Sequence, residues 1–256
     1  MSRARWAIPM CCLAAGLLLA TGRQEAADAP SPPKPSSYAP AADLIHQVEF
    51  FRGRLEEALA DKANYAGAME SRARKDANTL VVLALVLALH DEEHALKKSA
   101  PALFAAAQSM AADPADYDRT AKGWEQVKDA LAGKGASPDK VTWGPVAELG
   151  PLMKEVPFVH TNLKRGVADA RRFKRDAAQS AGQAATLAAI AQAAQFDTHE
   201  VKNPADVGEW RRLCAEMRDT SAAVAAAVKA GDQPAATRAL DKMMVSCDAC
   251  HAKFRH

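Results

Sequence analysis

An internal repeat limits the possible folds more than any other feature, because two similar segments in one chain are expected to form two similar units. The segment LIHQVEFFRGRL at 44–55 aligns with LMKEVPFVHTNL at 152–163, an offset of 108 residues. The segment PADYDRTAKGWEQVKDALAGK at 114–134 aligns, in the same order, with QPAATRALDKMMVSCDACHAK at 233–253, within a residue of an offset of 120. We therefore expect two copies of one unit.

The composition of both copies favours helices. Alanine is abundant and aromatic residues make up only 5% of the chain, so good helix formers are common and strand formers are scarce. Each copy has four helix-like stretches, separated by short breaks that indicate antiparallel packing. In the second copy they run roughly over 150–172, 177–195, 204–229 and 233–254. We predict an all-α chain of two tandem antiparallel four-helix bundles, at 42–146 and 147–256, joined by GKGASPDKVTWGP.

The N-terminus is typical of an export signal. Two arginines precede an uncharged stretch at 6–21, which is too short to span a bilayer comfortably and is followed by small residues. We predict a signal peptide at 1–27, a periplasmic location, and no stable membrane span after cleavage. A lipid anchor at Cys11 or Cys12 is a weaker alternative, and a retained membrane anchor is another.

The next segment, at 28–41, is rich in proline, and we predict a linker there that supplies neither a helix nor core. The formal net charge of +2 and the 49% of apolar residues describe a globular chain. We expect no nucleic-acid partner.

The last predicted helix contains CDAC followed directly by His251. Apolar residues and both cysteines recur along it at spacings of four and three, the inward stripe of a bundle helix. This stripe contains Ala236, Leu240, Met243, Cys247, Cys250 and Phe254. Both sulfur atoms are therefore expected to face the interior.

Three interpretations of the cysteine pair compete: a disulfide, part of a zinc site, and the attachment of a haem. A structural zinc site usually takes four protein ligands, and after signal cleavage Cys214 is the only other thiol. A thioredoxin-like pair would begin a helix in a βαβ unit, whereas this pair lies near the end of a helix. CxxCH is the attachment pattern of c-type haems, and we favour that interpretation.

The CxxCH motif on the fourth helix of a bundle, with Phe254 and Arg255 shortly after it, resembles the class II c-type cytochromes, the cytochrome c′ and c556 group. The resemblance covers 150–256 well and 42–134 only as a degenerate copy. It implies periplasmic one-electron transfer or binding of a small gas. It also implies one covalent haem c, with thioether bonds from Cys247 and Cys250 and iron bound by His251.

The resemblance also implies a distal residue on the first helix of the second copy. Met153 is the candidate iron ligand there, and its counterpart in the first copy is Ile45. His160 is a rival, and an open distal position is the third alternative. Lys253 and Arg255 are candidate partners of the haem propionates or of a redox protein, or are simply solvated cations that suit a helix C-terminus.

The first copy lacks the attachment groups, since Val127, Ala130 and Leu131 stand at the corresponding positions. We therefore expect one haem per chain. The first bundle should instead have a filled core and serve as a scaffold, docking surface or cover. The core residues expected there are Phe51, Leu83, Leu87, Trp124 and Val127.

Other conspicuous residues have simpler interpretations. HDEEH at 90–94 fits the HxxEH pattern of zinc peptidases, but a solvated helix end is the more ordinary interpretation. Cys214 is expected to be a small buried apolar residue rather than a reactive thiol. Trp210 is expected either to pack against a haem edge or to close the bundle.

The sequence therefore predicts an exported electron-transfer protein whose partner is another redox protein. The alternatives are a haem module that binds or senses a small gas, and a structural or docking protein in which the haem is secondary. The chain could also form a homodimer. No nucleophile and base accompany the CxxCH motif, so we do not expect an enzyme.

Overall fold

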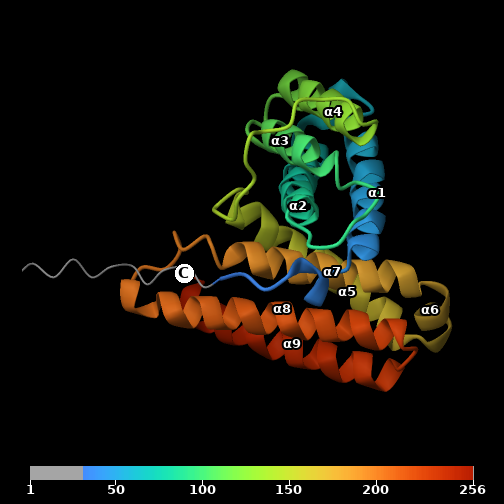
Figure 1. Ribbon diagram of the computed structural model, residues 1–256, viewed down its shortest axis with the longest axis vertical. Helices are drawn as coiled ribbons and strands as arrows, with labels where there is room; N and C mark the ends of the chain where they lie inside the picture. The colour runs from blue at the N-terminus through green and yellow to red at the C-terminus, as the bar shows by residue number, and fades with distance from the viewer. Residues whose placement is uncertain (1–30, 256) are drawn as a thin grey trace, which may run out of the picture.

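The computed structural model describes residues 31–255 and confirms the all-α prediction: within this range the regular elements are helices (Figure 1). The predicted signal peptide lies outside the described residues. The first half forms α1 (Ala41–Ala58), α2 (Glu70–Ala88), α3 (Ala100–Ala111) and α4 (Tyr117–Leu131). The second half forms α5 (Leu149–Ala168), α6 (Ala170–Arg175), α7 (Ala177–Ala194), α8 (Val207–Lys229) and α9 (Gln233–Phe254).

The helices pack in two groups. In the first group, α1 packs on α2, α2 on α3, and α3 on α4. In the second group, α7 packs on α8 and α8 on α9, while α5 contacts both α7 and α9 and so closes the bundle. The short helix α6 forms a corner at one end of the second group. The first group stands across the second (Figure 1).

The second long helix of each group is buried on every side. In α2 every residue from Asp76 to Leu87 is buried, and in α7 every residue from Ser180 to Ala194 is buried. A helix without a polar face is stable in water only when other elements surround it. Neighbours within one group cover part of each helix, and the other group covers the rest.

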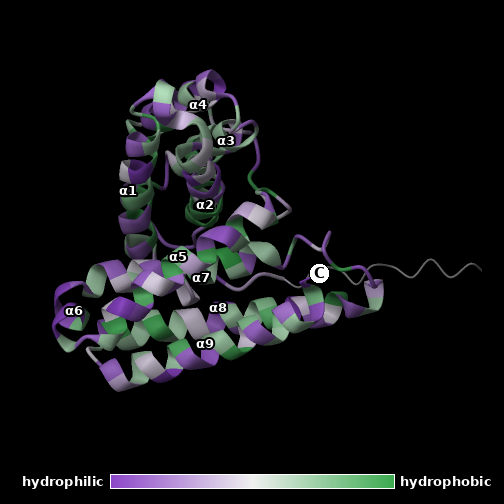
Figure 2. Ribbon diagram, turned by 180° about the vertical axis from the view of Figure 1, so that it is seen from behind, coloured by the Kyte–Doolittle hydropathy of each residue, from purple (hydrophilic) through white to green (hydrophobic). Residues whose placement is uncertain are grey.

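The two groups therefore share one hydrophobic core. Helix α1 packs on α7, and α2 packs on α5 and α7. Most of the buried apolar side chains of both groups form one continuous cluster, and Figure 2 shows apolar stretches of both groups where they meet. The five core residues predicted for the first bundle are all buried, at 0–5% exposure. That prediction is confirmed.

A polar cluster lies where α1 and α2 meet α5. Arg54 of α1 donates two hydrogen bonds to Asp76 of α2, at 2.9 and 2.8 Å. Its Nη2 atom also lies 3.5 Å from Oε1 of Glu155 on α5, and Lys75 Nζ lies 3.7 Å from Oε2 of the same residue. The guanidinium lies 4.0 Å from the ring centre of Phe158. This planar cation thus contacts three helices from both groups.

The linker prediction is wrong at its C-terminal end. A short 3-10 helix, η1 (Pro35–Ser37), forms there, and Tyr38 and Ala39 are 2% and 0% exposed within the shared core. Proline suits the first turn of a helix, and α1 follows at once, starting after Pro40. The segment is therefore part of the folded unit.

A pair of glycine substitutions tests the packing inside the first group. A Cβ atom at Gly123 of α4 would lie 2.7 Å from the Cα atom of Met110 on α3, whereas one at the exposed Gly53 of α1 would meet nothing within 4 Å. Gly123→Ala should lower the free energy of unfolding by about 1–3 kcal/mol. Gly53→Ala should raise it by about 0.5–1 kcal/mol, because alanine favours a helix. Urea denaturation measures both, and equal effects would contradict the packing.

The polar cluster predicts a pH dependence of stability. Burial, and next the charge of Asp76, raise the pKa of Glu155 from 4.5 to about 7, against the opposing effects of Arg54 and Lys75. Between pH 4.5 and about 7, Glu155 thus stays protonated in the folded chain but is ionised in the unfolded chain. The contribution of this proton to the free energy of unfolding is complete below pH 4.5 and is lost as pH rises through 7. Glu155→Gln should abolish this pH-dependent decrease in the free energy of unfolding, which is about 3 kcal/mol for a pKa raised from 4.5 to about 7.

The measurement is the free energy of unfolding as a function of pH. Glu56→Gln is the matched control, because it makes the same chemical change in a glutamate of α1 whose side chain is 66% exposed. A Glu155→Gln variant with the pH dependence of the wild type would contradict the assignment.

Candidate functional site

The CxxCH motif lies on the last helix, α9, which begins with strong local signals. Asp232 caps the helix by accepting a hydrogen bond from the backbone N–H of Ala235 at 2.9 Å, and a proline occupies the first turn. The helix ends at Phe254, as the sequence predicted. The motif therefore occupies the last two turns of α9.

Contacts with α8 determine the register of the motif. The rings of Trp210 and Phe254 meet edge to face at 5.2 Å, and Ser221 Oγ donates to Met243 Sδ at 3.1 Å. Cys214 stands four residues after Trp210, and Cys250 stands four residues before Phe254. The antiparallel hairpin thus places Cys250 opposite Cys214.

A small apolar cluster, separate from the main core, surrounds this end of the second group. Met153 of α5 and Cys250 of α9 both pack against it. Trp210 belongs to the cluster and donates from Nε1 to the carbonyl of Ala194 at 2.8 Å, so this tryptophan helps to close the bundle. The buried members are Leu149, Ala194, Trp210, Leu213, Cys214 and Phe254.

The two cysteines of the motif are half-buried rather than fully inward. The four apolar members of the predicted stripe are buried, at 0–6% exposure, but Cys247 and Cys250 are only partly covered. Cys247 packs against the edge of the main core, whereas Cys250 packs against the small cluster. His251 is exposed beside them. The expectation that both sulfurs face the interior is thus only half right, because this end of α9 has fewer covering neighbours.

All three thiols of the second group are held in the protonated form. Burial, followed by the proximity of Cys250 and Cys247, raises the pKa of Cys214. Burial is also the main cause that raises the pKa of Cys250 to about 11, and it raises that of Cys247. A redox-active dithiol needs a lowered pKa, so these values disfavour thioredoxin-like chemistry.

The two candidate distal ligands differ in their surroundings. Met153 contacts the same small cluster as Cys250. His160 lies seven residues further along α5, which is about 10 Å. Its Nε2 atom is buried without a hydrogen-bond partner among residues 31–255. Burial, and then Lys164, lower the pKa of His160. Either side chain thus has an electron pair to offer, and Met153 packs against the same apolar cluster as Cys250.

The cations after the motif have separate surroundings. Lys253 pairs with Asp206 at the start of α8, with 2.7 Å between Nζ and Oδ1. Arg255 is exposed. Within residues 31–255 no group of three or more His, Cys, Asp or Glu side chains is placed to hold a metal ion. The donors gathered at this end, namely thiols, an imidazole and a thioether, are nevertheless the types that bind a c-type haem.

The HDEEH segment is a solvated helix end only in part: Asp91, Glu92 and Glu93 are exposed, as expected, but His90 is buried and His94 is half-buried. His90 is 1% exposed, its Nε2 atom donates to the carbonyl of Ala39 at 3.2 Å, and its Nδ1 atom accepts from the N–H of Glu92. His94 Nε2 lies 2.9 Å from the carbonyl of Leu87. Both imidazoles thus hold the backbone where α2 ends.

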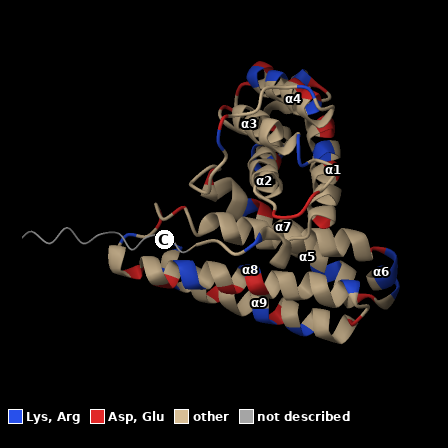
Figure 3. Ribbon diagram, viewed as in Figure 1, with Lys and Arg blue, Asp and Glu red and all other residues tan. Residues whose placement is uncertain are grey.

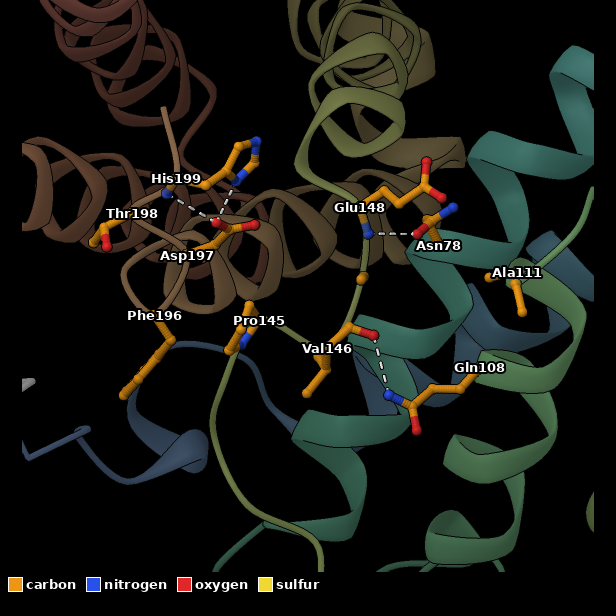
Figure 4. A pocket seen from close by; sticks show the side chains of 12 residues that line it. Asn78, Gln108, Ala111, Pro145, Val146, Glu148, Phe196, Asp197, Thr198 and His199 are labelled. Atoms are coloured by element: carbon orange, nitrogen blue, oxygen red, sulfur yellow. Dashed lines mark hydrogen bonds and ion pairs between the residues drawn. The ribbon is translucent and has the colours of Figure 1, made fainter. Parts of the chain in front are cut away.

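A cavity lies elsewhere, between the interbundle segment at 145–148, α2, α3 and the loop at 196–199 (Figure 4). It has a volume of about 630 Å³ and is lined by neither cysteine of the motif. Several of its polar groups bind one another: Asn78 accepts from the N–H of Glu148 at 2.7 Å, and Gln108 donates to the carbonyl of Val146 at 3.1 Å. Most of its polar lining is therefore already engaged in interactions within the protein.

The cavity has one titratable pair that the sequence analysis missed. His199 Nδ1 lies 2.5 Å from Asp197 Oδ1, and this hydrogen bond raises the pKa of the imidazole. The sequence shows that Asp197 and His199 are two residues apart. It does not show the cavity, because four segments that are distant along the chain form its walls. Thr198, which stands between the two residues, places a hydroxyl group in the same lining.

Comparison with known proteins adds no relative: no family model, curated protein or solved structure matches the chain. Within residues 31–255, no helix is both long enough and apolar enough to cross a membrane. The residues at the CxxCH end therefore provide the available indication of function.

Thiol reactivity tests the arrangement of the three cysteines. In the folded chain without haem, a thiol-specific reagent should modify Cys247 and Cys250 faster than Cys214, because Cys214 is 7% exposed and its thiol is the most strongly held in the protonated form. Peptide mapping by mass spectrometry gives the three rates. In denaturant the rates should become similar, and a Cys214 that reacts fastest in the folded chain would contradict this geometry.

Proposed function

We propose that this protein is an exported c-type cytochrome with one covalent haem, and that it transfers single electrons in the periplasm. The observation that carries the proposal is the placement of the CxxCH motif. Its two half-buried thiols lie on the last helix, and Cys250 shares an apolar cluster with the thioether of Met153. A haem bound there would supply a one-electron redox couple whose potential depends on axial ligands and burial.

Each residue of the motif has a separate role in the proposal. Cys247 and Cys250 stand three apart on one helix and supply the two thiols that attach the group. His251 supplies the proximal imidazole. Its side chain is exposed, so its ring is not packed into the core and is accessible to a haem iron. Arg255 is exposed nearby and provides positive charge for a propionate or for a redox partner.

The first helix group supports the site without carrying a haem itself. The positions that correspond to the motif hold Val127 and Ala130, which are 0% and 1% exposed, and Leu131, which is partly buried. Arg54 and Lys75 of this group contact Glu155, two residues beyond Met153 on α5. The first group thus helps to position the helix that offers the distal ligand.

Intact mass tests the attachment and its stoichiometry. The chain should be secreted together with a haem-attachment pathway, and the mature protein should carry one haem that survives denaturation. Cys247→Ala combined with Cys250→Ala should lose it, whereas Cys214→Ala should keep it, because Cys214 belongs to α8 and not to the motif. A second covalent haem, or none in the wild type, would overturn the proposal.

Carbon monoxide binding separates electron transfer from the alternative function, gas binding. If Met153 occupies the distal position, the reduced wild type should resist carbon monoxide and Met153→Ala should bind it readily. His160→Ala is the matched control, since His160 lies two turns along the same helix. If His160→Ala alone opened the site, His160 would be the ligand. A wild type that binds carbon monoxide freely would favour a gas-binding module.

A further inference from the structure

A dense set of exposed cations marks the end of the second group that α6 forms. Lys164 and Arg165 belong to the last part of α5, and α6 with its C-cap follows with the sequence ARRFKRD. The set falls within 12 consecutive residues, and all of its side chains are exposed. Figure 3 shows basic residues concentrated at α6. The members of this cationic end are Lys164, Arg165, Arg171, Arg172, Lys174 and Arg175.

Most of these charges are not neutralised within the protein. Arg175 forms an ion pair with Asp176, with 2.7 Å between Nε and Oδ1. The other five cations have no acidic partner within 4.0 Å among the described residues. Elsewhere on this molecule exposed cations are often paired, as in Arg212 with Glu209 and Lys62 with Asp118. The cationic end therefore keeps a large uncompensated charge.

The acidic residues around this end serve as helix caps. Asp169 accepts a hydrogen bond from the N–H of Arg172 at 2.8 Å. The α8–α9 turn lies beside the end of α5, where Gln233 donates to the carbonyl of Val167 at 2.7 Å, and it brings Asp232, the cap of α9. With Asp176, three carboxylates stand against six cations. The region thus retains net positive charge.

The cationic end has no exposed large apolar side chain. Phe173 of α6 is 4% exposed, and within residues 31–255 the exposed large apolar residue is Val245 of α9. Stable protein interfaces usually have a buried apolar and aromatic centre surrounded by a polar rim. A surface of charge alone suits a partner that presents many negative charges, and clusters of four to eight Lys and Arg residues are typical of binding to anionic lipids.

We propose that the cationic end docks this protein on a membrane surface through anionic phospholipid headgroups. The contact is electrostatic and reversible, because no apolar side chain is available for insertion. The end of the second group that holds the C-terminus lies opposite α6 (Figure 1). Met153 and Lys164 are 11 residues apart on α5, or about 16 Å. Docking through α6 would therefore leave the CxxCH end accessible.

Vesicle co-sedimentation of the full exported chain tests this proposal. The protein should bind vesicles that contain phosphatidylglycerol and should not bind vesicles of phosphatidylcholine alone. Binding should be strong at about 0.01 M salt and lost at about 1 M salt, where the screening length falls from about 30 Å to about 3 Å. Haem content does not enter the measurement, so its outcome is independent of the proposed electron transfer.

Two variants with the same change in net charge give the decisive comparison. Substituting Gln at Arg171, Arg172, Lys174 and Arg175 should weaken vesicle binding by at least about 100-fold, since each cation near an anionic surface contributes about fivefold. The control substitutes Gln at four exposed and dispersed lysines without an ion-pair partner among the described residues, namely Lys98, Lys122, Lys134 and Lys140. Circular dichroism checks that both variants fold. The control should bind much more tightly than the α6 variant.

Three results would overturn the proposal. Equal loss in both variants would mean that net charge alone determines binding. Binding to both kinds of vesicle would point to apolar insertion. Failure to bind anionic vesicles, together with α6-dependent binding of an acidic polypeptide such as polyglutamate, would assign this surface to an acidic protein partner.

Discussion

The architecture depends on a long uncharged stretch in each of two helices, α2 and α7. No charged residue occurs from Ala77 to Leu89 or from Ala177 to Phe196. Exposing apolar surface to water raises the free energy, so these stretches of α2 and α7 must be covered on all sides. The neighbours within one bundle cover only part of each helix. The two groups therefore dock, and their cores become one.

Apolar contact brings the groups together without specifying an orientation, because the hydrophobic effect has no direction. The polar cluster around Arg54 helps to fix the orientation of the two groups. Its guanidinium binds Asp76 through two hydrogen bonds and lies 3.5 Å from Glu155, which is 0% exposed. A planar, bidentate cation accepts few alternative geometries. The first group thus helps to position α5, the helix that carries Met153. This contact is more typical of a scaffold than of an independent domain.

The last helices of the two groups differ in how deeply they bury corresponding positions. In α4, Trp124 and Val127 are buried in the shared core. In α9, Cys247 and Cys250 are half-buried and His251 is exposed. The first pattern maximises packing, whereas the second keeps reactive groups at the edge of the core. In the proposed function, the first copy stabilises and the second copy carries the chemistry.

The helices and much of the candidate site could be predicted from the sequence, because both depend on local signals. The predicted helix at 233–254 has the observed limits of α9, and 177–195 ends within one residue of α7. The long predicted helix at 150–172 is instead divided at Asp169, whose side chain caps α6. The CxxCH motif is likewise a local pattern, as is the spacing of Met153 and His160 on one helix.

Only the tertiary structure decided which of these residues meet and which are covered. Tyr38, Ala39 and His90 were expected in a linker and a solvated helix end, yet all are buried. Composition predicts the backbone that a segment prefers, but burial depends on a surface supplied by residues far along the chain. The cluster shared by Met153 and Cys250 likewise follows from how the helices pack. The cations at α6 are close together in the sequence, but packing decides that most of them have no acidic partner among the described residues. By itself, then, the sequence determined the helices and the chemistry that they carry. Packing decided the neighbours of each residue, because those contacts join segments that no local pattern relates.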